Sequence, residues 1–143
     1  MITCETGVYR QSIVRVPVMV FINGSGYAAG MAFYQYIDLW SSQWTWGGQE
    51  PPEAGTISVI ENQATVYLDI ETPNLKVLVI DNATIIFEDS QDVTLNVEYI
   101  VIVNGGRLQV GTEQNPFQHR GVINLHGHLR SIELPICKLI LFR

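Results

Sequence analysis

Two stretches of the sequence decide the fold. Residues 77–87 read VLVIDNATIIF and residues 100–110 read IVIVNGGRLQV, so each position of the first lies 23 positions before its counterpart in the second. An earlier copy reads ISVIEN at residues 57–62, offset by 20, and TVYL at residues 65–68, offset by 19. A partial fourth copy, INLHG, occupies residues 123–127. Each unit therefore predicts two short strands separated by a turn.

A repeat of this length with two strands per unit is typical of a stacked β-solenoid. A single coil cannot bury its inward side chains, whereas stacked coils share one core of alternating apolar residues. We therefore predict an all-β, right-handed β-solenoid-like module. The expected stacking pairs are Val77 on Ile100, Val79 on Ile102, Ile85 on Leu108, and Phe87 on Val110. The alternative is a β-sandwich with hairpins at Asp81-Asn82 and Asn104-Gly105, which are both good turn sequences.

Composition narrows the class of protein. The chain has 143 residues, 47% of them hydrophobic and 15% charged, which suits one domain with a packed core, or one domain and a fragment. The net charge is −6, and residues 49–98 carry ten acids and one base. This balance argues against general nucleic-acid binding. There is no apolar run long enough to span a bilayer and no secretory signal sequence, so we expect the chain to leave the cytosol only within a longer protein.

The sequence changes character near Ile37. Residues 18–22 and 33–36 read as strands, whereas residues 39–52 are aromatic and then rich in Gly and Pro. We place the boundaries at residues 1–37, 38–134 and 135–143, the last being a divergent tail.

The repeat lies within a series of short motifs that resembles the eight-glycine (G-eight) domain family. The motifs are, in order, Leu39-Trp40-Ser41 with Trp44, Pro52-x-x-Gly55, Val66-x-Leu68-Asp69, Thr72-Pro73-x-Leu75, Gly105-Gly106-x-Leu108-x-Val110-Gly111-Thr112-Glu113-x-x-Pro116-Phe117, and Ile123-x-Leu125-His126-Gly127. The resemblance covers residues 39–134. It departs from the family at Asn62 and Asn82, where glycine is expected, and in the tail after Ile136.

The first 36 residues resemble the closing strands of an immunoglobulin-like plexin/transcription-factor (IPT/TIG) domain. The matching motifs are Ile2-Thr3-Cys4, Val18-x-Val20-x-Ile22-Asn23-Gly24, and Phe33 with Tyr36. Such a domain followed by an eight-glycine domain resembles the arrangement in fibrocystin-like proteins.

Residues 99–143, which contain two acids and five bases, hold the candidate ligand-binding residues. An anionic polysaccharide can bind there through charge-assisted hydrogen bonds, and the family resemblance implies hyaluronan. The alternative is ordinary surface charge. The candidates are Arg107, His119, Arg120, His126 and Arg130.

Other reactive side chains favour structural roles. The three histidines lack the cysteines or acids of a metal site, so we predict no metal and no cofactor. The acids lack the spacing of a calcium loop and read as turn and edge residues. We expect the tryptophans at 40, 44 and 46 to cap the open end of the stack, the alternative being a platform for sugars. Cys4 and Cys137 show no motif, and the sequons at Asn23 and Asn82 are candidate glycosylation sites.

These observations predict a function without catalysis. We expect a glycosylated, extracellular interaction module of a large, membrane-anchored, fibrocystin-like receptor ectodomain that binds an anionic glycan and no nucleic acid. One alternative is part of a hyaluronan-degrading enzyme. Another is a truncated fragment with little function of its own.

Overall fold

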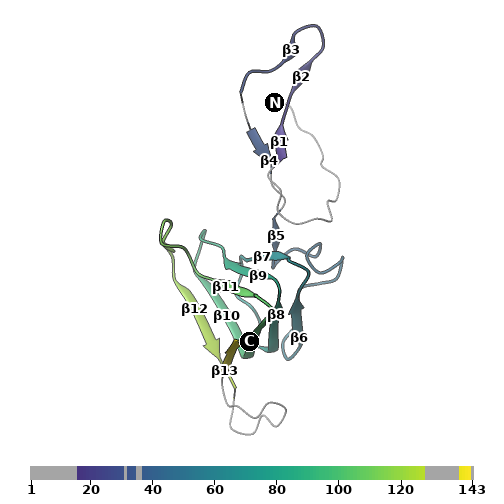
Figure 1. Cartoon of the computed structure of the whole chain (residues 1–143). Coiled ribbons are helices and arrows are strands. Elements are labelled where there is room, and N and C mark those ends of the chain that lie inside the picture. Colours follow the sequence, from purple (N-terminus) through teal and green to yellow (C-terminus); the bar gives the residue numbers. More distant parts are fainter. Residues whose placement is uncertain (1–15, 31, 35–36, 128–138, 143) are drawn as a thin grey trace. The chain divides into compact units, whose positions relative to one another are not determined.

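The computed structural model describes residues 16–30, 32–34, 37–127 and 139–142 (Figure 1). The chain divides into two compact units, Met1–Ile37 and Asp38–Arg143. Every regular element in the described residues is a β-strand, which confirms the predicted all-β class. The assignment of the first unit to an immunoglobulin-like domain stays a prediction.

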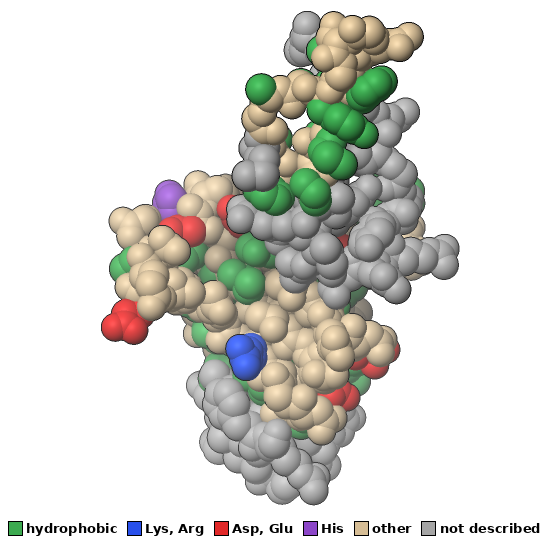
Figure 2. All heavy atoms as spheres, turned by 45° about the horizontal axis from the view of Figure 1, so that its top comes forward, with side chains coloured by type: hydrophobic (Ala, Val, Ile, Leu, Met, Phe, Trp, Pro, Cys, Tyr) green, Lys and Arg blue, Asp and Glu red, His purple; other side chains and the backbone are tan. Residues whose placement is uncertain are grey.

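The N-terminal unit consists of two antiparallel strand pairs. Strand β1 (Val16–Val18) pairs with β4 (Ala32–Tyr34), and β2 (Phe21–Ile22) pairs with β3 (Gly26–Tyr27). The Ser25 amide donates to the Ile22 carbonyl at 3.0 Å and closes the β2–β3 turn. The large apolar side chains described here are exposed, as Figure 2 shows along this unit: Val18, Met19, Val20, Phe21, Ile22, Tyr27 and Phe33.

The second unit contains two parallel sheets. The first sheet has the order β12-β10-β8-β6, and β13 also pairs with β10; the second has the order β11-β9-β7-β5 (Figure 1). The strands of the first sheet are β6 (Ile57–Ile60), β8 (Leu75–Asp81), β10 (Val93–Val103), β12 (Gly121–Leu125) and β13 (Leu139–Phe142). Those of the second are β5 (Asp38–Leu39), β7 (Thr65–Leu68), β9 (Thr84–Phe87) and β11 (Arg107–Gln109).

The chain alternates between these two sheets. From β5 to β11, each strand is followed by a strand of the other sheet, and every pair within a sheet is parallel. No consecutive strands of this unit pair as a hairpin within the described residues, so the turns at Asp81-Asn82 and Asn104-Gly105 lead from one sheet to the other. The stacked, solenoid-like arrangement is therefore confirmed over the hairpin-built sandwich. Its right-handed sense stays the expectation set by parallel crossovers.

Strand β10 divides into two parts at residue 98. Along one edge, residues 93–97 pair with β12 and residues 99–102 with β13; along the other edge, Val97 and residues 99–103 pair with β8. Alternation changes phase between these two parts, because Tyr99 and Ile100 are neighbours and both are buried. We name this break at residue 98 corner A. The turn at residues 104–106 is corner B, and the loop at residues 110–120 is corner C.

The inward side chains of successive coils form ladders through one core. In the second sheet Val66, Ile85 and Leu108 lie in register. In the first sheet Ile60, Ile80 and Ile102 do the same. These six belong to the hydrophobic core or pack against it. The coils are thus held together by apolar contacts between equivalent positions, as the repeat requires.

The predicted register is right in the second sheet and wrong by one residue in the first. Ile85 pairs with Leu108 as expected, but Val77 pairs with Tyr99 and Val79 with Val101. The third coil has one residue more than the second between these strands, at corner B. The constant offset of 23 residues is therefore correct for the strands after corner B and too large by one residue for the strands before it. The pair of Phe87 with Val110 lies beyond the ladder that β11 forms and stays a prediction.

Tryptophans cover the first coil. Trp40 is fully buried, and its ring meets that of Trp46 edge-on at 4.9 Å. The Trp46 Nε1 donates to the Trp40 carbonyl at 2.8 Å. Trp44, in contrast, is 68% exposed. The predicted cap is therefore confirmed for Trp40 and Trp46 and wrong for Trp44.

The tail contributes to the stack. Its residues 139–142 form β13, in which Leu139 pairs with Tyr99 and Phe142 with Ile102. The first sheet thus extends past residue 134, where we expected the module to end.

Candidate functional site

The structure distributes the predicted ligand-binding residues around the coil. Arg107 begins β11 directly after corner B, and His119 and Arg120 end corner C before β12. His126 follows β12, on the side that leads to corner A. All four side chains are exposed. Arg130 lies outside the described residues. Only His119 and Arg120 are therefore brought together, and they are neighbours in the sequence.

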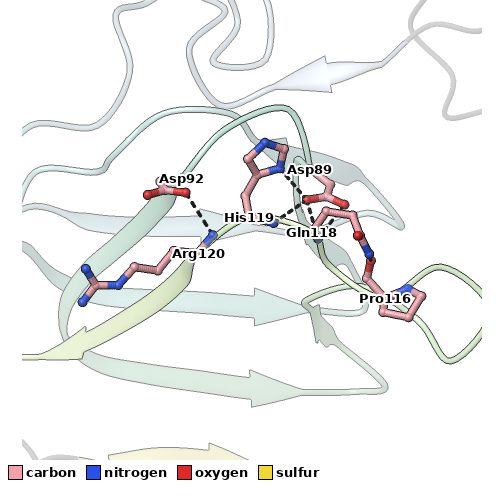
Figure 3. A network of polar contacts seen from close by, with 6 residues as sticks. All are labelled: Asp89, Asp92, Pro116, Gln118, His119 and Arg120. Carbon is pink, nitrogen blue, oxygen red and sulfur yellow. Dashed lines mark hydrogen bonds and ion pairs between the residues drawn. The ribbon is translucent and has the colours of Figure 1, made fainter.

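Corner C is built around two carboxylates (Figure 3). Asp89 accepts hydrogen bonds from the Gln118 amide at 2.9 and 3.0 Å and from the His119 amide at 3.2 Å. Its Oδ1 also lies 2.9 Å from Nδ1 of His119. Asp92 accepts from the Arg120 amide at 3.0 Å. Residues about 30 positions apart are thus joined, and the loop is fixed to the coil below it.

These contacts set the ionisation of Asp89. The hydrogen bond from the His119 side chain, together with those from the backbone amides, lowers the pKa of the Asp89 carboxyl below its ordinary value. Each of these bonds stabilises the charged form. Asp89 and His119 therefore hold the loop in place, and the sequence missed this pairing because the two residues lie 30 positions apart.

The two described arginines point outward without an ionic partner. In the part of the chain that the structure describes, neither Arg107 nor Arg120 forms an ion pair through its guanidinium. Figure 3 shows the Arg120 side chain extending away from the Asp89–His119 pair. A guanidinium presents a planar fork of donors that matches a carboxylate or sulfate. Both arginines can thus contact an external anion, but from different corners.

His126 belongs to a polar ladder on the outer side of β10 and β12. Asn96 and Asn124 are in register, and Nδ2 of Asn124 donates to Oδ1 of Asn96 at 2.9 Å. Nε2 of His126 lies 3.3 Å from the same oxygen. Nδ2 of Asn96 donates to Glu71 Oε1 at 3.1 Å and to the Thr72 carbonyl at 2.8 Å. The sequence contained a signal for this ladder, because both asparagines precede an apolar residue at matching strand positions.

Two further aspartates contact neighbouring coils. Asp69 accepts from the Ser41 amide at 3.0 Å, and Asp81 accepts from Nδ2 of Asn104 at 2.6 Å. Within the described ranges, no group of three or more His, Cys, Asp or Glu side chains is placed to hold a metal ion.

A small pocket lies at the first coil, where the sheets begin. Its volume is about 170 Å³, and it is lined by Asp38, Thr45, Trp46, Val59, Ile60, Glu61, Ala64 and Val66. Asp38 is in register with the core residue Val66 of the next coil, and partial burial raises the pKa of its carboxyl. Sequence reasoning missed this site because Asp38 precedes the first recognised repeat.

The two sequons differ in environment. Asn23 is exposed at the β2–β3 turn, followed by Gly24 with a φ of +82°. Asn82 is exposed as well, but its backbone is fixed between coils: its amide donates to the Val103 carbonyl at 3.2 Å, and its carbonyl accepts from the Gln63 amide at 2.8 Å.

No helix in the described residues has the length and apolar character needed to cross a membrane.

Comparison with known proteins agrees with the eight-glycine resemblance. The family model described as G8 domain matches residues 45–139. The chain is 51% identical to human Fibrocystin-L over 121 residues, 84% of its length, and 48% identical to mouse Fibrocystin-L over 136 residues, 94% of its length. It is 32% identical to mouse Fibrocystin over 98 residues, 68% of its length.

The chain spans only about 3% of Fibrocystin-L and 2% of Fibrocystin. No solved structure matches it. The family model nevertheless covers well over half of the chain, including most of the two sheets. The chain therefore belongs to the G8 domain family.

Proposed function

We propose that this chain is a non-catalytic, extracellular interaction module of a large, membrane-anchored, fibrocystin-like receptor ectodomain. The observation that carries the proposal is how the reactive groups of corners B and C are arranged. Asp89 and His119 direct their hydrogen bonds at each other and at their own loop, whereas the guanidinium groups of Arg107 and Arg120 face outward. This arrangement supports recognition of an anion more than acid–base chemistry.

The similarity to Fibrocystin-L supports the parentage. Identity of 51% extends over 84% of this chain, beyond the residues that the family model matches. In such a setting Asn23 is the preferred site of N-glycosylation, because the backbone of Asn82 is hydrogen-bonded to a coil on either side, whereas Asn23 lies in a turn of the β2–β3 pair.

The ligand that we propose is an anionic glycan such as hyaluronan. Arg107 and Arg120 lie at different corners, so a compact anion cannot engage both through a single pocket. An extended polymer with regularly spaced carboxylates can follow the surface between them. Both contacts are exposed to solvent, and we therefore expect weak binding that falls as the salt concentration rises.

The test is a pull-down of the full chain on immobilised hyaluronan, combined with an assay for shortening of the polymer. We expect the variant with both Arg107→Ala and Arg120→Ala to bind about fivefold more weakly, because exposed ion pairs contribute about 0.2–1 kcal/mol each. The neutral change Gln109→Ala on the same strand as Arg107 is the control and should bind as the parent does. Neutral dextran should not be retained.

Two results contradict the proposal. Shortening of hyaluronan by the purified chain would show catalysis. Retention that is equal for the parent and the double variant would show that these arginines do not recognise the polymer.

A further inference from the structure

The first coil leaves an open edge on the stack. Strand β6 is the terminal strand of the first sheet, and among the described residues it pairs only with β8. Half of its backbone N–H and C=O groups therefore face away from the sheet, in the arrangement that accepts an added strand. The outward side chains of β6 are apolar and exposed: Ile57 is 60% exposed and Val59 49%.

The small pocket opens beside this edge, since Val59 and Ile60 of β6 line it. Two carboxylates, of Asp38 and Glu61, and the indole of Trp46 line it as well, and no basic side chain does. The volume of about 170 Å³ is far above the roughly 10–15 Å³ that one water molecule needs.

Hydrogen bonds and aromatic packing within the protein hold the wall of the pocket in place. The Trp46 ring is held by its hydrogen bond to the Trp40 carbonyl at 2.8 Å and by its contact with the buried Trp40 ring. The neighbouring Thr45 Oγ1 donates to the Leu39 carbonyl at 2.6 Å. Glu61 Oε1 accepts from the neutral amide of Asn62 at 3.1 Å. A ligand thus meets a rigid aromatic face and two carboxylates that have no cationic partner among the described residues.

We propose that this end of the stack binds an extended segment of a protein partner, which pairs with β6 and places a Lys or Arg side chain between Asp38, Glu61 and Trp46. Charge complementarity selects this occupant. A cation offsets the cost of the partly buried Asp38 carboxylate, whose pKa burial raises, and it can lie against the indole face. Residues 49–98, which carry ten acids and one base, add a negative potential that attracts a basic segment from a distance.

The two apolar side chains of β6 supply the remaining contacts. In an added strand, side chains alternate between the two faces. Apolar residues directly before and after the base would therefore lie on the face of the added strand opposite to the base. Other apolar residues of the segment would lie beside Ile57 and Val59. The pattern that we expect in the partner is a short β-prone segment with one Lys or Arg and no acid.

The test uses the full chain labelled with ¹⁵N and a capped pentapeptide, Thr-Val-Lys-Val-Thr, with a matched peptide that has norleucine in place of lysine. We expect the lysine peptide to shift the amide signals of residues 57–60 and the Trp46 indole signal saturably. The norleucine peptide should bind about tenfold more weakly, because it lacks the charge but keeps the strand and the apolar stem.

Variants of the protein provide the second arm. The double change Asp38→Asn and Glu61→Gln should reduce affinity for the lysine peptide by about tenfold and leave that for the norleucine peptide unchanged. The change Glu53→Gln removes an exposed acid of the same segment outside the pocket and should have no effect. The comparison of the two peptides on the parent protein needs no variant to fold.

Several outcomes would overturn the proposal. Equal binding of both peptides would show a merely apolar surface, and the absence of any saturable shift would show that the edge is closed in the full chain. Shifts of the same amides that depend on protein concentration without peptide would show that a second copy occupies the edge. Loss of binding in Glu53→Gln equal to that in the double variant would show attraction by general charge.

Discussion

The N-terminal hairpins and the stacked coils have the same kind of sequence but opposite environments. Residues 18–22 of the first unit and residues 77–80 of the second are all apolar. In the second unit Leu78 and Ile80 are buried, whereas in the first unit all five residues are exposed. The difference is in the neighbours: a coil has another coil on at least one side, and a hairpin of the first unit has only its own partner strand among the described residues.

This contrast shows where the stability of the second unit originates. A strand pair by itself buries little, so hydrogen bonding within a pair is not sufficient for a stable fold. Stacking adds a core that is shared between coils, and each added coil covers the apolar side of the one before it. Stability in this module therefore depends on contacts between equivalent positions of successive coils.

The largest predicted effect compares two phenylalanines. Phe87 is 2% exposed in the core, whereas Phe21 is 61% exposed in the hairpin and touches Tyr27 edge-on. We expect Phe87→Ala to lower the free energy of unfolding of the stack by about 3–5 kcal/mol, because it leaves a cavity between coils. Phe21→Ala should change it by less than about 0.5 kcal/mol. Urea unfolding followed by tryptophan fluorescence measures both.

The tryptophans at 40, 44 and 46 all belong to the second unit, so this signal reports on the stack. A large loss on Phe21→Ala would break the comparison, because it would mean that the hairpin contributes to the stability of the coils.

A close backbone approach gives the next effect. An ideal Cβ on Gly106 would lie 2.2 Å from the Ile80 carbonyl oxygen, which belongs to the coil below, whereas one on Gly24 would meet nothing within 4 Å. Gly106→Ala must therefore separate the coils at corner B, and we expect a loss of about 1–3 kcal/mol in the same unfolding experiment. Gly24→Ala should leave the unfolding of the stack unchanged, since its strain is confined to the hairpin turn. An unchanged midpoint for Gly106→Ala would show that the coils separate at little cost.

The same corner explains how far the sequence predicts the fold. The alternation of Val, Ile and Leu and the repeat itself are local patterns, so the solenoid-like stack and the ladder of Ile85 on Leu108 followed from them. The register of the first sheet did not follow. One additional residue at corner B changes the register of every pair in the strand before it. Because the turn can have either length, a comparison of the repeats at one constant offset does not reveal this residue.

The candidate site was less predictable for a related reason. Charge along the chain suggested one cationic face, but the structure places Arg107, Arg120 and His126 at different corners of the coil. The contact of Asp89 with His119 joins residues 30 positions apart, and the pocket at Asp38 exists only because β5 begins a sheet. Such pairs depend on the number of residues per coil, and the offsets of 19 to 23 residues between the recognised copies do not fix that number.

The smallest predicted effect concerns pH and again contrasts the two regions. Corner C is fixed by the Asp89 carboxylate, whereas the β2–β3 turn is closed by a backbone hydrogen bond from Ser25 to Ile22. Because the pKa of Asp89 is lower in the folded state, its contribution is complete above the pKa of an unfolded aspartate, about 3.9. That contribution is lost progressively as the pH falls below this value towards the lower pKa of the folded state.

Hydrogen exchange of single amides measures this effect. Between pH 5 and pH 3, corrected for intrinsic rates, we expect the Gln118 and His119 amides to lose protection while the Ser25 amide does not. In Asp89→Asn the protection of corner C should be lower at pH 5 and nearly independent of pH. Asp38→Asn is the control. Burial raises the pKa of the Asp38 carboxyl, so this group favours the folded state at low pH, and its contribution to stability has the opposite sign to that of Asp89. Protection at corner C that stays constant down to pH 3 in the parent would show that the loop is held without Asp89.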